Sequence, residues 1–294
     1  MKKNPSCKVC SSAGLTSLGK SYPEKLMRCK DCGLIQFIQD PSEEELNSHY
    51  GNYPVSGGVS DITIKRYEEI LDTLEPYRVK GRLLDVGCGE GFFLEVAKRR
   101  GWEVHGTEFS PLYIPICESK GINMKFGRLN PDDYTHDFFD VITWFEVIEH
   151  INNPNKEIES FRKIIRPEGA VYVTTPNINS ISRILLKGKW TAITYPDHLC
   201  YYSPFSIKKL FLRYGFHVVS LKTTGVSIGR IKDSLRNGKS EKPDGFHETD
   251  RVWQERFEKK GLMHLLKFVI NHILDLTGKG DSLKVLFRLD KANA

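Results

Sequence analysis

The sequence lacks any uninterrupted apolar run of about 18 residues, which is the length that a membrane-spanning helix needs. The charged start, Met1-Lys2-Lys3-Asn4-Pro5, has no apolar segment behind it, so we expect no signal peptide and predict the cytoplasm as the compartment. Dense basic runs are also missing, although 43 Lys and Arg residues face 37 Asp and Glu residues. The net charge of +6 is therefore interpreted as an ordinary solvated surface, which leaves nucleic acid open as a partner without favouring it.

Cysteine is scarce except near the N-terminus, where four of the seven cysteines form two C-x-x-C pairs: Cys7, Cys10, Cys29 and Cys32. This spacing is typical of a zinc ribbon, in which two tight turns aim four thiolates at one ion. Four protein ligands leave no open position, so the predicted Zn²⁺ is structural. Two alternatives are disulfides, which a cytosolic chain disfavours, and a redox pair, which favours a strand-to-helix setting. The remaining cysteines, Cys88, Cys117 and Cys200, are interpreted as small buried hydrophobes.

Beyond Gly81, short apolar runs alternate with segments of helical periodicity. The predicted strands are 82–86, 103–108, 123–126, 139–145, 170–175 and 217–224, with a turn at Pro167-Glu168-Gly169 before the fifth strand. The predicted helices between them are 92–100, 111–120, 154–165 and 205–214. Such alternation is typical of a doubly wound α/β fold with a mostly parallel sheet and helices on both faces.

The first of these strands leads into a glycine-rich segment, Asp85-Val86-Gly87-Cys88-Gly89-Glu90-Gly91. Alternate glycines let a ligand approach the backbone closely, and the helix that follows offers free N–H groups. A nicotinamide-dinucleotide loop needs a further glycine where Phe92 stands. Glu108 ends the next strand, where a carboxylate can accept both ribose hydroxyls. The sequence therefore predicts an adenosine ligand at the carboxyl ends of the strands.

On these residues the sequence resembles the class I S-adenosylmethionine-dependent methyltransferases. The resemblance implies a Rossmann-like, seven-stranded sheet and S-adenosylmethionine as cofactor. It also implies that the cofactor is bound by Asp85, Gly87, Cys88, Gly89, Gly91, Glu108, Phe109, Ser110, Phe145 and Glu146. Arg128 departs from the pattern because it stands where the family commonly has an acid for the adenine amine. Asp132 or Asp133 is expected to take that role.

Several further segments resemble a bacterial branch of these enzymes that has cysteine pairs ahead of the catalytic domain. They are Phe138–Ile142, Phe145–Ile151, Ile165–Gly169, Asp197–Leu199, Tyr202–Pro204 and Gly215-Phe216. The branch is often found with polysaccharide or secondary-metabolite pathways. It implies a small-molecule acceptor, such as a sugar-linked biosynthetic intermediate. Two alternatives stay open: an RNA methyltransferase, and a non-catalytic module that only binds an adenosine ligand.

Two histidines are the candidate catalytic bases, because a hydroxyl or carbon acceptor must lose a proton near neutral pH. His198 follows the fifth strand in an aromatic-rich segment, and His150 follows the fourth. For each histidine the alternative is a structural hydrogen bond to backbone. Glu146, Glu149 and His150 also resemble a segment of ubiquinone-pathway O-methyltransferases, which implies a divalent-metal site if the segment is helical.

The predicted domain organisation has five parts. Residues 1–50 form the small zinc-binding module, 51–80 a linker or lid with a leading helix, and 81–226 the methyltransferase core. Residues 227–281 are an insertion, and 282–294 hold the final strand and tail, with the strand at 282–289. The insertion contains an apolar helix, predicted at 261–276, that packs in a core or forms a homodimer contact; binding to a membrane surface is the minor alternative.

Overall fold

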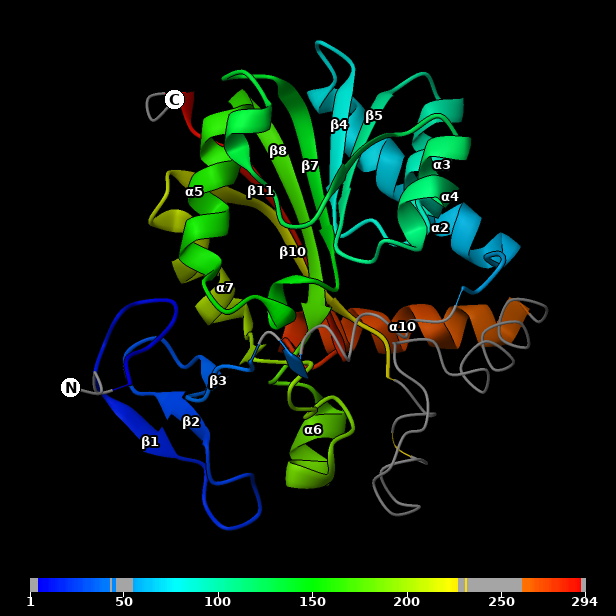
Figure 1. The fold of residues 1–294 in the computed structure, drawn as a ribbon. Coiled ribbons are helices and arrows are strands. Elements are labelled where there is room, and N and C mark those ends of the chain that lie inside the picture. The colour runs from blue at the N-terminus through cyan, green and yellow to red at the C-terminus, as the bar shows by residue number, and fades with distance from the viewer. Residues whose placement is uncertain (1–4, 43, 46–54, 227–230, 232–260, 292–294) are drawn as a thin grey trace. The chain divides into compact units, whose positions relative to one another are not determined.

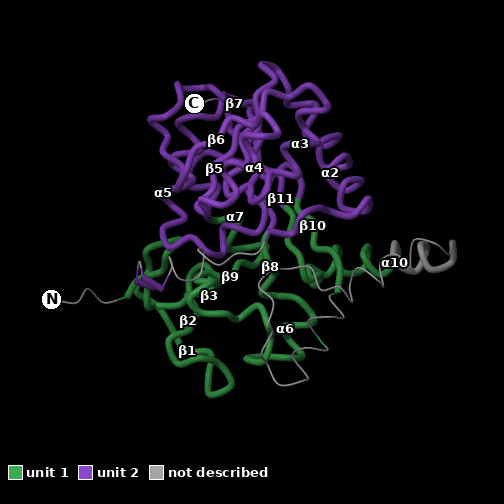
Figure 2. The backbone as a smooth tube through the Cα atoms, turned by 45° about the vertical axis from the view of Figure 1, so that its right-hand side comes forward, with its two compact units in different colours: residues 1–40, 175–209, 221–284 green, residues 41–174, 210–220, 285–294 purple. Residues whose placement is uncertain are grey.

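The computed structural model describes residues 5–42, 44–45, 55–226, 231 and 261–291, and for 261–268 the backbone alone. The chain divides into two compact units, each made of several segments (Figure 2). Unit 1 comprises residues 1–40, 175–209 and 221–284, and unit 2 comprises residues 41–174, 210–220 and 285–294. This division cuts across the predicted boundaries, because residues 1–40 share a unit with a stretch of the expected methyltransferase core.

Unit 2 is built on the larger sheet, which has seven strands in the order β10-β11-β8-β7-β4-β5-β6 (Figure 1). Their bounds are β4 (Arg82–Val86), β5 (Glu103–Glu108), β6 (Asn123–Phe126), β7 (Phe139–Phe145), β8 (Ile165–Pro176), β10 (Phe216–Thr224) and β11 (Ser282–Leu289). β4 pairs in parallel with both β5 and β7, and the β5–β6 and β7–β8 pairs are also parallel. The predicted seven-stranded, mostly parallel fold is confirmed.

The helices are α2 (Asp61–Leu74), α3 (Phe92–Arg99), α4 (Tyr113–Ser119), α5 (Pro154–Ile164) and α7 (Pro204–Leu212). Side chains alternate along a strand, so Trp144 and Phe145 of β7 point to opposite faces of the sheet. Trp144 packs against Phe161 of α5, with ring centroids 4.9 Å apart, and Phe145 packs against Phe93 of α3 at 4.8 Å. Helices α5 and α3 therefore cover opposite faces, as the doubly wound prediction requires (Figure 1).

One predicted turn is wrong. The structure continues β8 through Pro167-Glu168-Gly169, and the β7–β8 register shifts between Phe139 and Val141. Glu168 has a φ of +61°, and a Cβ on Gly169 would lie 2.9 Å from the Asp140 carbonyl oxygen. The segment is thus an irregularity within a paired strand. The sequence prediction failed because proline and glycine are common both in turns and in β-bulges.

Unit 1 contains a four-stranded antiparallel sheet in the order β1-β2-β3-β9. β1 (Leu15–Ser17), β2 (Leu26–Cys29) and β3 (Ile35–Phe37) come from the cysteine-rich N-terminus, whereas β9 (Cys200–Tyr201) comes from far along the chain. In this register Gln36 lies opposite Cys200, and Ile35 opposite Tyr201. The N-terminal strands are therefore not a separate sheet, because the segment after β8 supplies the fourth strand.

An apolar cluster joins two segments of unit 1, residues 1–40 and 175–209. The ring of Phe37 lies 5.1 Å from that of Tyr195 and 6.4 Å from that of Tyr201. The buried members of the cluster are Leu26, Ile35, Phe37, Ile178, Leu186, Trp190, Ala192 and Tyr201. Leu186 ends α6 (Ile181–Leu186), the short helix of this segment. Burial of these side chains is the main force that holds the N-terminal strands on residues 175–209.

The C-terminal helix α10 (Gly261–Thr277) lies where the sequence predicts a helix. Among its described side chains Leu274 is buried, while Val269, Ile270, Ile273 and Leu276 are exposed. Much of the predicted insertion, residues 227–230 and 232–260, lies outside the described residues. In the described part of the chain, no helix combines the length and the apolar character needed to span a bilayer.

Candidate active site and cysteine cluster

Three glycines shape the loop between β4 and α3, and each has a positive φ: Gly87 (72°), Gly89 (53°) and Gly91 (73°). A Cβ on Gly87 would lie 2.7 Å from Cγ2 of Val147, and a Cβ on Gly91 would lie 2.7 Å from Cδ1 of Ile122. Packing therefore requires both of these glycines. A Cβ on Gly89 would meet nothing within 4 Å, so the middle of the loop borders open space and its backbone can be approached closely.

Glu108, at the end of β5, forms hydrogen bonds to the backbone of this loop and of the segment that follows β5. Its Oε2 accepts the backbone N–H of Gly89 at 2.9 Å, and its Oε1 accepts that of Ser110 at 2.8 Å. Each carboxylate oxygen has a second lone pair, so both can still accept a hydroxyl. The predicted ribose-binding acid is thus fixed beside the open part of the glycine loop.

Asp85 lies at the end of β4 and is 3% exposed. Its Oδ1 accepts the Thr143 hydroxyl at 2.7 Å. Burial raises the pKa of Asp85 to about 8, the Thr143 hydrogen bond opposes this, and the charge of Glu108 adds to it. Two carboxyl groups with different environments therefore lie next to the loop, and burial favours the protonated form of Asp85.

The residues after Glu108 are an aromatic and a hydroxyl. Phe109 is 37% exposed and stacks on Phe126 of β6, with centroids 6.3 Å apart and an interplanar angle of 23°. Ser110 is buried, and its Oγ has no hydrogen-bond partner among the described residues. An exposed aromatic pair and an unsatisfied hydroxyl next to Glu108 suit a planar, polar ligand.

At the end of β7, Phe145 and Glu146 differ in environment. Phe145 packs on Phe93 and Tyr172 on the sheet face. Glu146 has a φ of +52°, and its N–H donates to the Thr174 carbonyl at 3.0 Å. Such a backbone conformation in a non-glycine residue costs energy and is concentrated at functional sites.

His150 ends a three-residue 3₁₀ turn, Ile148–His150, and its N–H donates to the Val147 carbonyl at 3.0 Å. Glu146 lies outside this turn. The three residues Glu146, Glu149 and His150 therefore do not share one face of a helix, and this condition for the expected metal site is wrong. The chain makes a tight turn here instead.

Arg128, which departs from the family pattern, acts on a buried acid in the structure. Burial raises the pKa of Glu157 in α5, and the positive charge of Arg128 counteracts this. Asp132 and Asp133, the expected substitutes, form the 3₁₀ turn Pro131–Asp133, in which the Asn130 side chain accepts the N–H of Asp132. Their proposed role toward adenine stays a prediction.

Sequence reasoning gave no role to Glu90, although it lies within the glycine loop. Its carboxylate accepts the N–H and the hydroxyl of Ser56, at 2.8 and 2.6 Å, and the N–H of Gly57 at 3.4 Å. Ser56 and Gly57, which lie in the stretch predicted as a linker or lid, are thereby bonded to the loop. No signal in the sequence predicted this contact.

His198 lies in unit 1, in the segment before β9. Its Nδ1 lies 2.8 Å from the Ala192 carbonyl oxygen, its N–H donates to the Thr194 carbonyl at 2.8 Å, and its Nε2 lies 3.6 Å from Oδ2 of Asp197. A carbonyl oxygen only accepts, so Nδ1 carries the proton and the neutral ring has its lone pair on Nε2.

The family model described as a methyltransferase domain matches residues 62–221, more than half of the chain. The chain belongs to this methyltransferase domain family. Residues 85–91, 108–110 and 145–146 all lie within the matched range. S-adenosylmethionine is the cofactor that the family implies, and the open volume at Gly89, the fixed Glu108 and the unsatisfied Ser110 hydroxyl fit it.

Among curated relatives, the domain is 30% identical over 138 residues to the ubiquinone biosynthesis O-methyltransferase of Cereibacter sphaeroides, covering 40% of this chain and 56% of the relative. The enzyme of the same name from Aeromonas salmonicida is 29% identical over 112 residues, covering 36% of this chain and 47% of the relative. The chain thus spans about half the length of the curated relatives it matches.

Solved structures agree on the fold of the methyltransferase domain. A SAM dependent methyltransferase from Archaeoglobus fulgidus superposes with a TM-score of 0.52 at 16% identity, covering 83% of this chain and 97% of that one. Phosphoethanolamine N-methyltransferase 2 of Haemonchus contortus, in complex with S-adenosyl-L-methionine, gives 0.50 at 19% identity, covering 83% and 56%. Identities this low show the fold alone.

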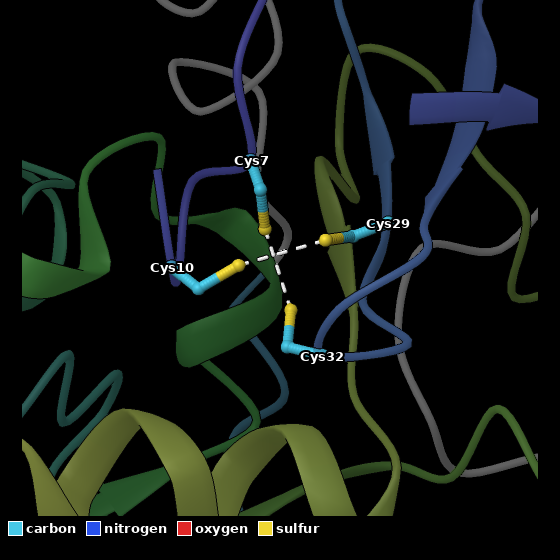
Figure 3. A group of neighbouring side chains, drawn as sticks. All are labelled: Cys7, Cys10, Cys29 and Cys32. Atoms are coloured by element: carbon cyan, nitrogen blue, oxygen red, sulfur yellow. Dashed lines mark hydrogen bonds between the residues drawn. The ribbon is translucent and has the colours of Figure 1, made fainter. Parts of the chain in front are cut away.

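The four N-terminal cysteines lie outside the range matched to the methyltransferase domain, and the structure brings them together (Figure 3). The Sγ atoms of Cys7 and Cys32 are 3.4 Å apart, those of Cys10 and Cys29 are 3.5 Å apart, and all four lie within 4.8 Å of one another. Zn–S bonds of about 2.3 Å in a tetrahedron place two sulfurs about 3.8 Å apart. All seven cysteines are free thiols. The cluster therefore fits a structural Zn²⁺ and none of its members forms a disulfide.

Proposed function

We propose that the chain transfers a methyl group from S-adenosylmethionine to a small-molecule acceptor, such as a sugar-linked or related biosynthetic intermediate. The observation that supports this most is the open glycine loop beside Glu108 in a chain of the methyltransferase domain family. The names of the relatives, which are O-methyltransferases of ubiquinone biosynthesis, agree with a hydroxyl of a small molecule as acceptor.

In this proposal the residues of unit 2 bind and orient the cofactor. Glu108 accepts the ribose hydroxyls, the Gly87–Gly91 backbone lies along the aminocarboxypropyl tail, and Phe109 lies against the adenine. Asp85, Cys88, Ser110, Phe145 and Glu146 complete the proposed cofactor site. The bound cofactor supplies a methyl group on a sulfonium, which is open to in-line displacement, so positioning provides much of the rate.

His198 is the proposed general base and His150 the second candidate. The Ala192 carbonyl fixes the His198 tautomer, which leaves Nε2 as the atom that takes the proton of an acceptor hydroxyl. We expect His198→Ala to lower kcat by about 10²–10⁴-fold and to leave the Kd for S-adenosylmethionine unchanged. Unchanged turnover would move the role to His150, which His150→Ala tests in the same assay.

RNA is the second acceptor class, and the cysteine-rich strands give it little support. Lys8 forms an ion pair with Asp40 at 2.9 Å, and the Lys25 ammonium donates to the side chain of Gln39. Basic side chains engaged in this way are poorly available to phosphates. Binding of RNA that weakens steeply with salt would favour the RNA acceptor.

Calorimetric titration with S-adenosylmethionine and its demethylated product is the direct test, with Glu108→Ala as the variant. We expect micromolar binding by the wild-type chain and at least about a tenfold loss in the variant, because two charge-assisted contacts disappear. Acceptor screening then starts with sugar nucleotides. Binding without turnover of any acceptor would support the non-catalytic module, and absence of binding would refute the proposed cofactor site.

Two further parts of the proposal are separate from catalysis. Cys7, Cys10, Cys29 and Cys32 are proposed to bind one structural Zn²⁺, which a metal assay on the purified chain checks. A homodimer through α10 is proposed because Val269, Ile270, Ile273 and Leu276 are exposed. Sedimentation of the wild-type chain and of Leu276→Glu tests that contact.

A further inference from the structure

Gln36 is a buried polar side chain in an otherwise apolar strand, and it is 1% exposed. Its Oε1 accepts the backbone N–H of Lys8 at 2.8 Å, and its Nε2 donates to the Ser6 carbonyl at 2.9 Å. These two backbone groups flank Cys7, the first residue of the cysteine cluster. One amide therefore fixes the turn that presents Cys7 and Cys10, and an apolar residue in its place would leave both groups unsatisfied.

The main chain at Gln36 is tied to a different part of unit 1. Gln36 lies opposite Cys200 in the β3–β9 pair, and the N–H of Phe37 donates to the Leu199 carbonyl at 2.9 Å. β9 has two residues, and a strand this short needs outside support to keep its place. Leu199 directly follows His198 in the chain, so the position of β3 sets where the His198 segment ends.

The His198 ring is held by contacts from the same segment. Nδ1 contacts the Ala192 carbonyl, and the Tyr201 hydroxyl donates to the His198 carbonyl at 3.2 Å. Tyr201 in turn lies opposite Ile35 and packs on Phe37. A shift of β3 would therefore move both the backbone of His198 and a ring that supports it.

We propose that Gln36 is a positioning residue that links the cysteine cluster to His198, so that metal bound by the four cysteines aligns the catalytic histidine. This inference rests on the proposed function, in which His198 is the base. It predicts that the cysteine cluster affects how His198 removes a proton from the acceptor. The residues proposed to bind S-adenosylmethionine all lie in unit 2, so binding of the cofactor is independent of the link.

The test compares Gln36→Met with Gln39→Met. Methionine matches glutamine in length and removes the amide. Gln39 serves as the control because, in the contacts that we describe, its amide bonds only the exposed side chain of Lys25. Acylation of His198 by diethyl pyrocarbonate, mapped by mass spectrometry, reports on its alignment without any acceptor. The His198 side chain is 14% exposed, so its rate of acylation rises when the segment loosens.

In Gln36→Met we expect His198 to be acylated at least about five-fold faster, because local opening exposes it. His217 of unit 2 provides the internal reference and keeps its rate. The Kd for S-adenosylmethionine stays within about two-fold, since none of the residues proposed to bind it shares a described contact with Gln36. Gln36→Glu, which keeps the acceptor for Lys8 and loses the donor to Ser6, should give an intermediate rate. Gln39→Met should match the wild-type chain.

Chelation of the metal from the wild-type chain is the second arm and needs no substitution, so it decides the matter even where Gln36→Met fails to fold. We expect stripping to accelerate acylation of His198 and added Zn²⁺ to reverse it. Unchanged acylation in the stripped chain overturns the link. If acylation responds while His198→Ala keeps full activity, the link stands and the proposed base is wrong. If the wild-type chain binds no S-adenosylmethionine, the proposed function fails while the acylation result still stands.

Discussion

Both units fix a distant piece of backbone with one fully buried side chain, but they use different chemistry. In unit 2, Asp140 is 0% exposed, and its carboxylate accepts the backbone N–H groups of residues 79–82 and the Nε of Arg166. In unit 1, Asn177 is also 0% exposed, and its Nδ2 donates to the carbonyls of Gly278 and Gly280 at 3.0 and 2.7 Å. Gln36 has the same role at the cysteine cluster.

The difference follows from what each unit must hold together. Asp140 gathers the N–H groups of a single loop before β4, and a buried carboxylate is stable there because it has several donors and a cation. Asn177 and Gln36 instead face neutral peptide groups of both kinds, carbonyl oxygens and N–H groups. An amide, with one donor and one acceptor end, satisfies both without burying a charge. The neutral amides of Asn177 and Gln36 thus act in unit 1 as the charged Asp140 does in unit 2, although unit 1 also has a buried carboxylate, Asp281, which accepts the Ser182 hydroxyl.

The largest effect should come from Asp140→Ala, which leaves Arg166 without its buried partner and four N–H groups without an acceptor. Removing one partner of a buried ion pair costs about 3–5 kcal/mol in the free energy of unfolding. Chemical denaturation monitored by tryptophan fluorescence measures it. Asp72→Ala is the control, because this exposed carboxylate pairs with Arg100 at 2.7 Å and is worth about 1 kcal/mol or less. Equal losses in the free energy of unfolding would show that burial does not make the Asp140 contacts more stabilising than an exposed ion pair.

The pH dependence of stability should report on a second buried carboxyl group of unit 2, that of Asp85. Burial raises the pKa of Asp85 to about 8, whereas an aspartate in the unfolded chain titrates near about 4. Between these values the folded chain holds a proton that the unfolded chain has released. Stability therefore falls as pH rises from 4 to 8, by at most about 1.4 kcal/mol per pH unit from this group. Unfolding from pH 5 to 8 should show a flatter fall in Asp85→Asn, and an identical slope in both chains contradicts the prediction.

Asn177→Ala is the corresponding substitution in unit 1. It removes the donor to one buried and one partly buried carbonyl and the acceptor for the N–H of Asn179, so we expect the free energy of unfolding to fall by about 1–3 kcal/mol. The loss should be smaller than that for Asp140→Ala, since no charge is left unpaired. Asn179→Ala, at an exposed position, is the control. If Asn177→Ala lowered the free energy of unfolding as much as Asp140→Ala does, a buried amide and a buried carboxylate would stabilise the two units equally.

Two glycines separate packing from ligand binding within unit 2. A Cβ on Gly91 would collide with Ile122, so Gly91→Ala should lower the free energy of unfolding by about 1–3 kcal/mol. Gly89→Ala meets open space and has only the positive φ to strain, for about 1–2 kcal/mol, but its methyl group projects where the cofactor is proposed to lie. We expect Gly89→Ala to weaken S-adenosylmethionine binding at least as much as Gly91→Ala does. Full affinity in Gly89→Ala would place the cofactor elsewhere.

The same contrast explains how much the sequence could predict. In the larger sheet, the predicted strands match the observed bounds to within one residue, including the last one, Ser282–Leu289, except that β8 begins at Ile165, five residues before the predicted start. Local periodicity is enough there, because each strand and helix is continuous in the sequence. The bulge at Glu168 escaped, since proline and glycine predict a turn and a bulge equally well.

In unit 1, the spacing of the four cysteines predicted that they meet, and they do. The partner of their sheet could not be predicted, because Cys200–Tyr201 is too short to show any periodicity and pairs with a strand from the other end of the chain. The tautomer of His198 is likewise set by a carbonyl, that of Ala192, which every residue type offers. Contacts made by backbone groups do not depend on residue type, so the sequence does not predict them.

The smallest effect should come from the only ion pair that we describe between the cysteine turn and the end of β3. Lys8 and Asp40 are 2.9 Å apart, but the Asp40 side chain is 56% exposed, so water and salt screen the pair. Asp40→Asn should change the free energy of unfolding by less than about 1 kcal/mol and leave the metal content unchanged. This result would leave the neutral Gln36 amide as the group that holds the turn. A loss comparable to that of Asn177→Ala, and one that disappears in 1 M salt, would mean that a charge closes unit 1 as well.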